Sequence, residues 1–274
     1  MSGSLQPVRE RRLVFGEVAN SYDRQRPSYP PEIVDGILSF ACLQDESTTA
    51  VAEVGAGTGK ASVLFAQRGI SLSCLEPSPS MAALARENLA PFPNAAVLET
   101  SYEDWQPVAH SYGLVFAAQS WHWVSPELRY QKAHLALKGR GSLALLWNVV
   151  LSRGDESLED ALAAAYGDLI ETKPERNRSE RIAAHNWLMD EIEASGLFEP
   201  GPLTVLCQPW RHTYEAEAFV ELLSTHSDHR MLEEGTRAQL FDRIRTALDA
   251  GGGHVEVGYV TVCYLARTLG GNLP

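Results

Sequence analysis

The chain of 274 residues is long enough for one large domain, or for a core domain that carries an inserted segment. Apolar residues make up 45% and charged residues 21%, which is close to the average for a globular protein. The formal net charge of -12 argues against a general affinity for nucleic acid or an anionic membrane, and no apolar run is long enough to span a bilayer.

Two helices are expected before the first strand. Residues 9–24 have a mixed helical pattern, which the prolines of RPSYPP at 26–31 must end. Pro31 suits the first turn of a second helix, whose apolar positions include Ile33 and Ile37.

A regular alternation of strands and helices follows. Short apolar runs predict strands at 49–55, 70–76, 95–100, 112–119 and 141–148. Helical patterns lie between them at 61–69, 79–90 and 125–138. Near-continuous apolar strands separated by helices are typical of a parallel sheet that is covered on both faces.

The alternation stops after the fifth strand. Two helices are expected at 155–172 and 179–195, joined by a polar stretch at 173–181. They follow the carboxyl edge of the sheet, where ligands bind in open α/β folds, so they predict a helical cap over a site; a purely structural appendage is the alternative. A strand at 203–210, helices near 214–224 and 233–250, and a β-rich segment at 253–267 complete the chain.

These elements predict a division of the chain into four parts. They are N-terminal helices that close over the site (1–48), a ligand-binding core (49–150), a cap insertion (151–200) and a C-terminal completion of the sheet (201–274).

The N-terminus and the cysteines indicate the compartment. MSGSLQPVRERR lacks the apolar segment of a secretory signal. Cys42, Cys74, Cys207 and Cys263 form no CxxC pair and no zinc-type cluster. Four reduced thiols, a cytoplasmic location and no bound metal are therefore expected.

The glycine-rich segment VAEVGAGTGKAS follows the first strand and is typical of a nucleotide site. A phosphate-binding P-loop would need glycine where Val54 stands and serine or threonine where Ala61 stands. A dinucleotide site needs G-x-G-x-x-G, whereas Gly55, Gly57 and Gly59 give G-x-G-x-G. Both of these interpretations are therefore disfavoured.

Two acids favour a third ligand, S-adenosylmethionine. Glu76, at the end of the second strand, suits a ribose diol, which both NAD and S-adenosylmethionine present. Glu53, just before the glycines, would repel a pyrophosphate but attract the ammonium of a methionine. A nicotinamide-dependent oxidoreductase and a non-methylating protein that binds S-adenosylmethionine remain the alternatives.

Four segments resemble the class I S-adenosylmethionine-dependent methyltransferases. They are E-x-G-x-G-x-G at 53–59, LEPSPSMAALAR at 75–86, SYEDW at 101–105 and LKGRGSLALLW at 137–147. The last departs from the family's LKPGG-like turn. Outside this core, FGEVANSYDRQRPSYP and AAQSWHWV resemble the small-molecule methyltransferases grouped around trans-aconitate methyltransferase.

The resemblance implies a fold and a reaction. The fold is a doubly wound α/β sheet of seven mostly parallel strands, in the order 3-2-1-4-5-7-6 with strand seven antiparallel. The reaction is methyl transfer from S-adenosylmethionine to a small organic acceptor (carboxylate, hydroxyl, amine or carbon), which leaves S-adenosylhomocysteine. A monomer or homodimer without nucleic-acid or membrane partners is expected.

The resemblance and the chemistry together suggest residues for the cofactor. Gly55, Gly57 and Gly59 let the backbone approach the ligand, and Glu76 accepts hydrogen bonds from the ribose. Glu53 lies near the methionine ammonium.

Further residues are expected to bind the adenine of the cofactor. In the resembling proteins, the positions of Pro77 and Met81 flank the adenine. Glu103 corresponds to the acid that binds the adenine amine, with the backbone of Tyr102 beside it; Asp104 is the competitor, and a capping or surface role is the alternative for Glu103.

Three residues are expected at the methionine end or above it. Gln119 follows strand four, where the backbone of this fold meets the methionine. Tyr22 and Arg26 belong to the N-terminal segment that closes over the cofactor; Tyr22 is a candidate catalytic residue, and Arg26 is expected to pair with the methionine carboxylate. An exposed arginine that fixes its loop is the alternative.

Aromatic side chains mark the acceptor end. Trp121, His122 and Trp123 follow strand four, and Trp147 ends strand five at the same rim. The functional interpretation is an aromatic pocket with His122 as a general base or anchor. The alternative packs the indoles in the interior. Four later residues could reach the site or merely pack: Trp187, Trp210, His226 and His229.

Overall fold

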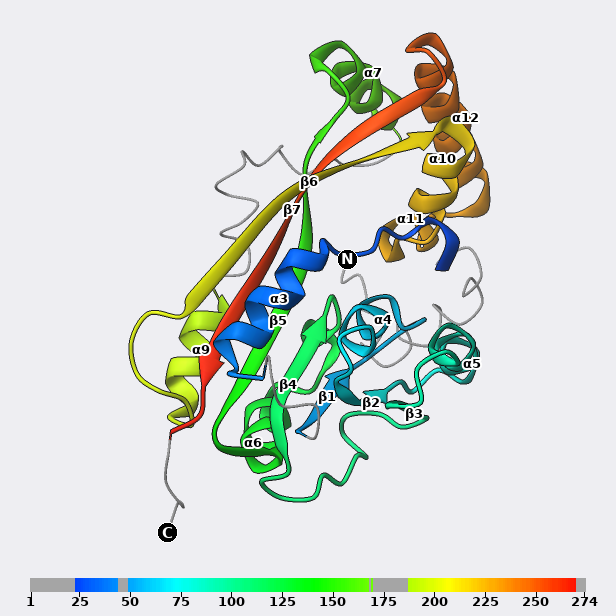
Figure 1. The fold of residues 1–274 in the computed structure, drawn as a ribbon. Coiled ribbons are helices and arrows are strands. Elements are labelled where there is room, and N and C mark those ends of the chain that lie inside the picture. The colour runs from blue at the N-terminus through cyan, green and yellow to red at the C-terminus, as the bar shows by residue number, and fades with distance from the viewer. Residues whose placement is uncertain (1–22, 44–48, 168, 170–186, 270–274) are drawn as a thin grey trace, which may run out of the picture.

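The computed structural model describes residues 23–43, 49–167, 169 and 187–269 (Figure 1). Most of the helix expected at 9–24 lies outside these residues, and so do Tyr22 and the polar stretch expected at 173–181.

Seven strands form one sheet in the order β3-β2-β1-β4-β5-β7-β6. The strands are β1 (Ala50–Val54), β2 (Ser71–Leu75), β3 (Ala95–Leu98), β4 (Tyr112–Ala118), β5 (Leu137–Arg153), β6 (Thr204–Glu215) and β7 (His254–Arg267). Strands β1 to β5 pair in parallel, and β7 is antiparallel to both β5 and β6. The predicted fold class and strand order are confirmed.

Helices connect the parallel strands as the sequence predicts. They are α3 (Pro31–Phe40) before β1, α4 (Lys60–Ala66), α5 (Pro79–Leu89) and α6 (Pro126–Ala136). Pro31 occupies the first turn of α3, and the expected apolar positions Ile33 and Ile37 are buried. A proline at this position loses nothing, because the first amides of a helix have no partner within it.

Two apolar layers cover the sheet. On one face α3 and α4 pack against the strands, and Phe65 of α4 stacks on Phe116 of β4 with ring centroids 4.1 Å apart. On the other face α6 and α9 (Trp187–Ser195) share an apolar cluster with Trp121, whose ring contacts Tyr130 of α6. Burial from both sides explains why β4 is an almost unbroken apolar run.

Strands β5, β6 and β7 extend well beyond the rest of the sheet (Figure 1). β5 has 17 residues, where the sequence predicted eight at 141–148. β6 continues to Glu215, into a stretch predicted to be helical, because it stays paired with β7 as far as His254. This extension carries α7 (Glu156–Tyr166), α10 (Ala216–Ser224) and α12 (Glu234–Ala250), which enclose a third apolar cluster.

The segment predicted as a cap, 151–200, is divided between two places. Helix α7 packs against α12 at the end of the extension, whereas α9 packs against α6 beside the core. An ion pair between Arg129 of α6 and Glu191 of α9, with Arg129 also 4.9 Å from the Trp187 ring, ties α9 there. The described residues of this segment therefore do not form one layer over the site.

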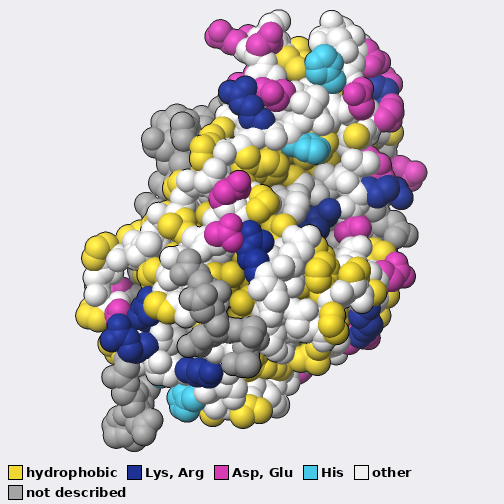
Figure 2. Space-filling model, in the orientation of Figure 1, with side chains coloured by type: hydrophobic (Ala, Val, Ile, Leu, Met, Phe, Trp, Pro, Cys, Tyr) yellow, Lys and Arg dark blue, Asp and Glu magenta, His cyan; other side chains and the backbone are white. Residues whose placement is uncertain are grey.

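Charged side chains are unevenly distributed over the surface. On the face shown in Figure 2, acidic side chains gather around the end formed by α7 and α12, while lysines and arginines are scattered. This face offers no continuous basic surface of the kind that binds nucleic acid. Within the described residues, no helix is both long enough and apolar enough to cross a membrane.

Candidate functional site

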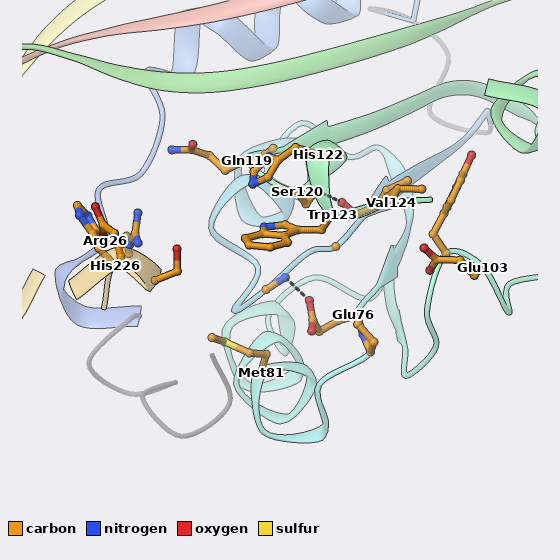
Figure 3. Close-up of a pocket in the computed structure, with 18 residues that line it drawn as sticks. Arg26, Glu76, Met81, Glu103, Gln119, Ser120, His122, Trp123, Val124 and His226 are labelled. Carbon is orange, nitrogen blue, oxygen red and sulfur yellow. Dashed lines mark hydrogen bonds between the residues drawn. The ribbon is translucent and has the colours of Figure 1, made fainter. Parts of the chain in front are cut away.

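A cavity of about 420 Å³ opens at the carboxyl ends of β1, β2 and β4. Its walls come from the glycine turn after β1, the start of α5, the loop after β4 and the start of α11 (Ser227–Arg230). Figure 3 shows Arg26 and His226 together on one side, Gln119, His122 and Trp123 along another, and Glu76 and Met81 below. This is the crevice where open α/β sheets bind ligands.

A second, smaller cleft of about 40 Å³ adjoins it. Tyr29, Glu53, Thr58 and Lys60 line this cleft. It is polar and has both signs of charge, so it suits a small zwitterion better than an apolar group.

The glycine turn requires glycine for its backbone. Gly55, Gly57 and Gly59 have φ values of +67°, +59° and +86°, in the left-handed region that other residues rarely adopt. At Gly55 a Cβ would also lie 2.7 Å from the Cβ of Ser120. The turn and the loop after β4 are therefore packed directly against each other, and the Ser120 hydroxyl donates to the carbonyl of Val54.

Glu76 is held in place by the turn. One carboxylate oxygen accepts from the Gly57 amide and the other from the Ser78 amide, each at 2.8 Å. Burial raises the pKa of Glu76, and these two hydrogen bonds oppose that shift. Each oxygen keeps a lone pair for a ligand, so two neighbouring hydroxyl groups can be bound at once. This arrangement fits the predicted ribose contact.

Glu53 is only 1% exposed and accepts a hydrogen bond from the Ser62 hydroxyl. Burial raises the pKa of its carboxyl to about 8. Glu53 shares the small cleft with Lys60. Burial lowers the pKa of the Lys60 ammonium, and the negative charge of Asp23 opposes this shift. A cation that enters the cleft would stabilise the ionised form of Glu53.

Apolar side chains contribute to the wall of the large cavity. Pro77, Met81 and Tyr102 line it, and the Tyr102 hydroxyl is fixed by a 3.0 Å hydrogen bond to a carbonyl of α6. Glu103 lines the cavity and also accepts from the Ser125 amide at the start of α6, at 3.0 Å. Asp104 is bonded to Ser101 instead, at 2.6 Å, and is not among the residues that line the cavity.

His122 and Trp123 line the cavity from the short 3₁₀ turn Trp121–Trp123. Their rings are 4.8 Å apart, and His122 is exposed to solvent. Arg26 lines both cavities and donates to the Thr225 hydroxyl at 2.9 Å, so the N-terminal segment is tied to the end of α10.

Two residues predicted to bind the acceptor are part of the core instead. Trp121 is fully buried, with Tyr102 and Tyr130 packed around it at centroid distances of 5.8 and 5.7 Å. Trp147 is 4% exposed and packs against Tyr264. Neither lines the cavity, because both point into the apolar layer beneath α6 and α9. Tyr22, the other predicted catalytic residue, lies outside the described residues.

Of the four later residues that were left open, only His226 lines the cavity. Trp187 packs on an arginine of α6, Trp210 stacks on Tyr259 and His229 is buried.

Several other lining residues were not predicted, among them Lys60, Ser120 and Asp228. Lys60 has a clear signal, since it directly follows Gly59, but once Val54 and Ala61 had excluded a P-loop the sequence suggested no role for it. Ser120 and Asp228 have no signal of this kind; only the packing of the β4 loop and of α11 brings them to the cavity.

His226, Asp228 and His229 lie close together, and the atoms through which they could bind a metal ion are within 4.8 Å of one another. His229 bonds Asp228 at 3.1 Å through one ring nitrogen and the Tyr166 hydroxyl at 2.9 Å through the other. Burial, with the charge of Arg26, lowers the pKa of His226 to about 3, so its ring is neutral at neutral pH. The same positive charge opposes a metal cation, and we assign no metal to this group.

The comparisons with known proteins agree with this geometry. Residues 51–141 match a protein-family model described as a methyltransferase domain. An uncharacterized methyltransferase of Mycobacterium tuberculosis (strain ATCC 25618 / H37Rv) is 28% identical over 268 residues, which cover 94% of this chain and 97% of the relative. An uncharacterized methyltransferase-like protein of Schizosaccharomyces pombe is 33% identical over 128 residues, 46% of this chain and 48% of the relative.

Solved structures share the fold. A protein of Anaeromyxobacter dehalogenans described as a type II methyltransferase has a TM-score of 0.63 at 17% identity, covering 90% of this chain and 99% of that one. Phosphoethanolamine N-methyltransferase 2 of Haemonchus contortus, solved with S-adenosyl-L-methionine, has a TM-score of 0.51 at 12% identity, covering 98% of this chain and 61% of that one. None of these names points to the trans-aconitate group, so that narrower resemblance stays a prediction.

Proposed function

We propose that the chain, whose residues 51–141 match a methyltransferase domain, transfers a methyl group from S-adenosylmethionine to a small organic acceptor. The observation that carries the proposal is the position of the Glu76 carboxylate. It lies just after the carboxyl end of β2, accepts a hydrogen bond from the Gly57 amide and keeps lone pairs that can bind a ribose. A large cavity of about 420 Å³ is in the range of small-molecule sites and supports a small acceptor.

When bound, S-adenosylmethionine supplies a methyl group already activated on a sulfonium sulfur. The work left to the protein is to bind, orient and exclude water, and such positioning contributes on the order of 7–11 kcal/mol. Glu76 holds the ribose, and Pro77, Met81 and Tyr102 enclose the adenine, with Glu103 at its edge.

The methionine part of S-adenosylmethionine binds in the small cleft. Glu53 there serves the ammonium, and Arg26 with Lys60 serves the carboxylate. A nicotinamide-dependent oxidoreductase is the weaker alternative, because Gly55, Gly57 and Gly59 lack the G-x-G-x-x-G spacing and a pyrophosphate would bring Glu53 no cation.

His122 and Trp123 form the acceptor side of the cavity. His122 takes the proton of a hydroxyl or amine acceptor, while a carboxylate acceptor has no proton to lose and would only be anchored. The Arg26 contact with Thr225 joins the described N-terminal residues 23–43 to the end of α10 at one side of the site.

Binding of S-adenosylhomocysteine tests the proposal. By calorimetry, the protein is expected to bind it far more tightly than NADH. Glu76→Ala is expected to weaken this binding by about 1.5–3 kcal/mol, the usual range for hydrogen bonds to a charged group. Glu87→Ala, which removes an exposed acid of α5, is the control and should bind as the wild type does. Tight NADH binding without a response to S-adenosylhomocysteine would refute the proposal.

The pH dependence of this binding is expected to depend on Glu53. With its pKa raised to about 8 by burial, the carboxyl is mostly protonated at neutral pH, and an ammonium in the cleft drives the proton off. Fewer protons are then held in the complex, so affinity should increase as pH rises from about 6.5 to 8. Calorimetry in buffers of different ionisation enthalpy would detect the released proton. Glu53→Gln should lose the pH dependence, and an equal slope in both proteins would exclude Glu53 as its source.

A further inference from the structure

Five residues line both the large cavity and the small cleft: Arg26, Gly55, Gly57, Ala118 and Gln119. They therefore mark the junction between the two spaces. In S-adenosylmethionine the sulfonium sulfur joins the adenosine to the methionine chain. With the adenosine in the cavity and the amino-acid end in the cleft, as the proposed function places them, the sulfur and its methyl group belong at this junction.

Only one of the five has a neutral side-chain oxygen to offer to a positive sulfur. Two are glycines and one is alanine, so they have no polar side chain. Arg26 is a cation and would repel a sulfonium. The carboxamide oxygen of Gln119 is an acceptor and carries the negative end of a dipole. Figure 3 shows this side chain extending from the end of β4 towards the side where Arg26 and His226 lie.

The backbone at Gln119 is held in an unfavourable conformation. Its φ is 62°, in the left-handed region that a glutamine seldom adopts. The Gln119 amide donates to the Leu146 carbonyl at 2.9 Å, and the next residue, Ser120, is bonded to Val54 and packed on Gly55. Strain of this kind persists only where the surroundings enforce it, and it gathers at functional sites.

We propose that the Gln119 carboxamide faces the sulfonium and stabilises its positive charge, which makes Gln119 the residue that distinguishes the charged cofactor from its neutral product. Fixed dipoles in a site closed to water are effective because they need no reorganisation when the ligand binds. The inference rests on the proposed function, since it requires S-adenosylmethionine in the cavity.

The ratio of two affinities tests the proposal without an acceptor. S-adenosylmethionine and S-adenosylhomocysteine differ only at the sulfur, so the ratio of their Kd values reports the groups that face it. Gln119→Leu keeps the size of the side chain and removes the oxygen. It is expected to shift the ratio against S-adenosylmethionine by about tenfold, with the Kd of S-adenosylhomocysteine nearly unchanged. Gln119→Glu should shift the ratio in the opposite direction.

A third variant separates the side chain from the strain. Gln119→Gly relieves the left-handed φ, so Tm should rise by a few degrees while the ratio shifts as in Gln119→Leu. A ratio that stays at the wild-type value in Gln119→Leu and Gln119→Glu would overturn the inference alone. Failure of the wild type to bind S-adenosylhomocysteine would overturn the proposed function and this inference with it.

Discussion

Replacing Trp121 by alanine is expected to lower the free energy of unfolding by about 3–5 kcal/mol. The indole is fully buried between Tyr102 and Tyr130, in the apolar layer under α6 and α9. Its removal leaves a cavity that the surrounding helices can fill only in part. For a chain of this length such a loss lowers Tm by roughly 6–20 °C, which thermal unfolding followed by circular dichroism would measure.

The control comes from the same turn. Trp123 is half-buried and lines the cavity, so Trp123→Ala should change stability by less than about 1 kcal/mol. Trp121→Phe, which keeps an aromatic ring, should be intermediate and remain folded if the alanine variant does not. A Trp121→Ala protein as stable as the wild type would contradict a core role for Trp121 and favour its predicted role in the acceptor pocket.

The two tryptophans show where the sequence stops being informative. Both follow β4, and three residues are too few for a periodic pattern to show which side chains point inward. The 3₁₀ turn directs Trp121 into the layer between the sheet and α6 and leaves Trp123 in the cavity wall. The prediction for Trp147 was wrong for a related reason. On a strand that is covered on both faces, the side chains that point to either face are apolar, so the sequence does not show which face Trp147 is on.

The core of the fold could be predicted because its signals are local. Apolar runs locate β1, β2 and β4, and the glycines after β1 and Glu76 after β2 mark the carboxyl edge of the sheet. Gly55, Gly57 and Glu76, expected from these signals, line the cavity, and so does Glu103, which the resemblance suggested; their contacts with a cofactor stay predictions. The length of β5 and β6 was not predictable, since it depends on pairing with β7, more than 100 residues after β5.

The predicted cap illustrates the same limit. Amphipathic patterns show that α7 and α9 must each bury one face, but not which partner they bury it against. The Arg129–Glu191 ion pair joins α9 to α6, and apolar residues of α7 join it to α12. The start of α11 comes to the cavity instead, with His226 and Asp228. This wall has no sequence motif that we could identify in advance.

His122→Ala is expected to lower kcat by about 100-fold when the acceptor is a hydroxyl or an amine. The imidazole lines the cavity on the loop after β4, next to Trp123 and one turn from Gln119, so it can reach an acceptor placed over the junction of the two cavities. His226 cannot replace it as a base, because burial and Arg26 hold the pKa of that ring at about 3. The affinity for S-adenosylhomocysteine should stay nearly unchanged, since none of the proposed ribose, adenine or methionine contacts involves His122.

The measurement is kcat and KM for both proteins, with an acceptor selected from a panel of carboxylic acids, phenols, alcohols and amines and labelled S-adenosylmethionine. With a carboxylate acceptor no proton leaves, so the variant should show a raised KM at an almost unchanged kcat. His212→Ala is the matched control, because this exposed histidine of β6 packs on Tyr214 and is absent from the cavity wall. It should retain both constants. A His122→Ala protein that also retains both would mean that the ring only packs against Trp123, and the acceptor would then have to be bound and deprotonated by other groups of this wall.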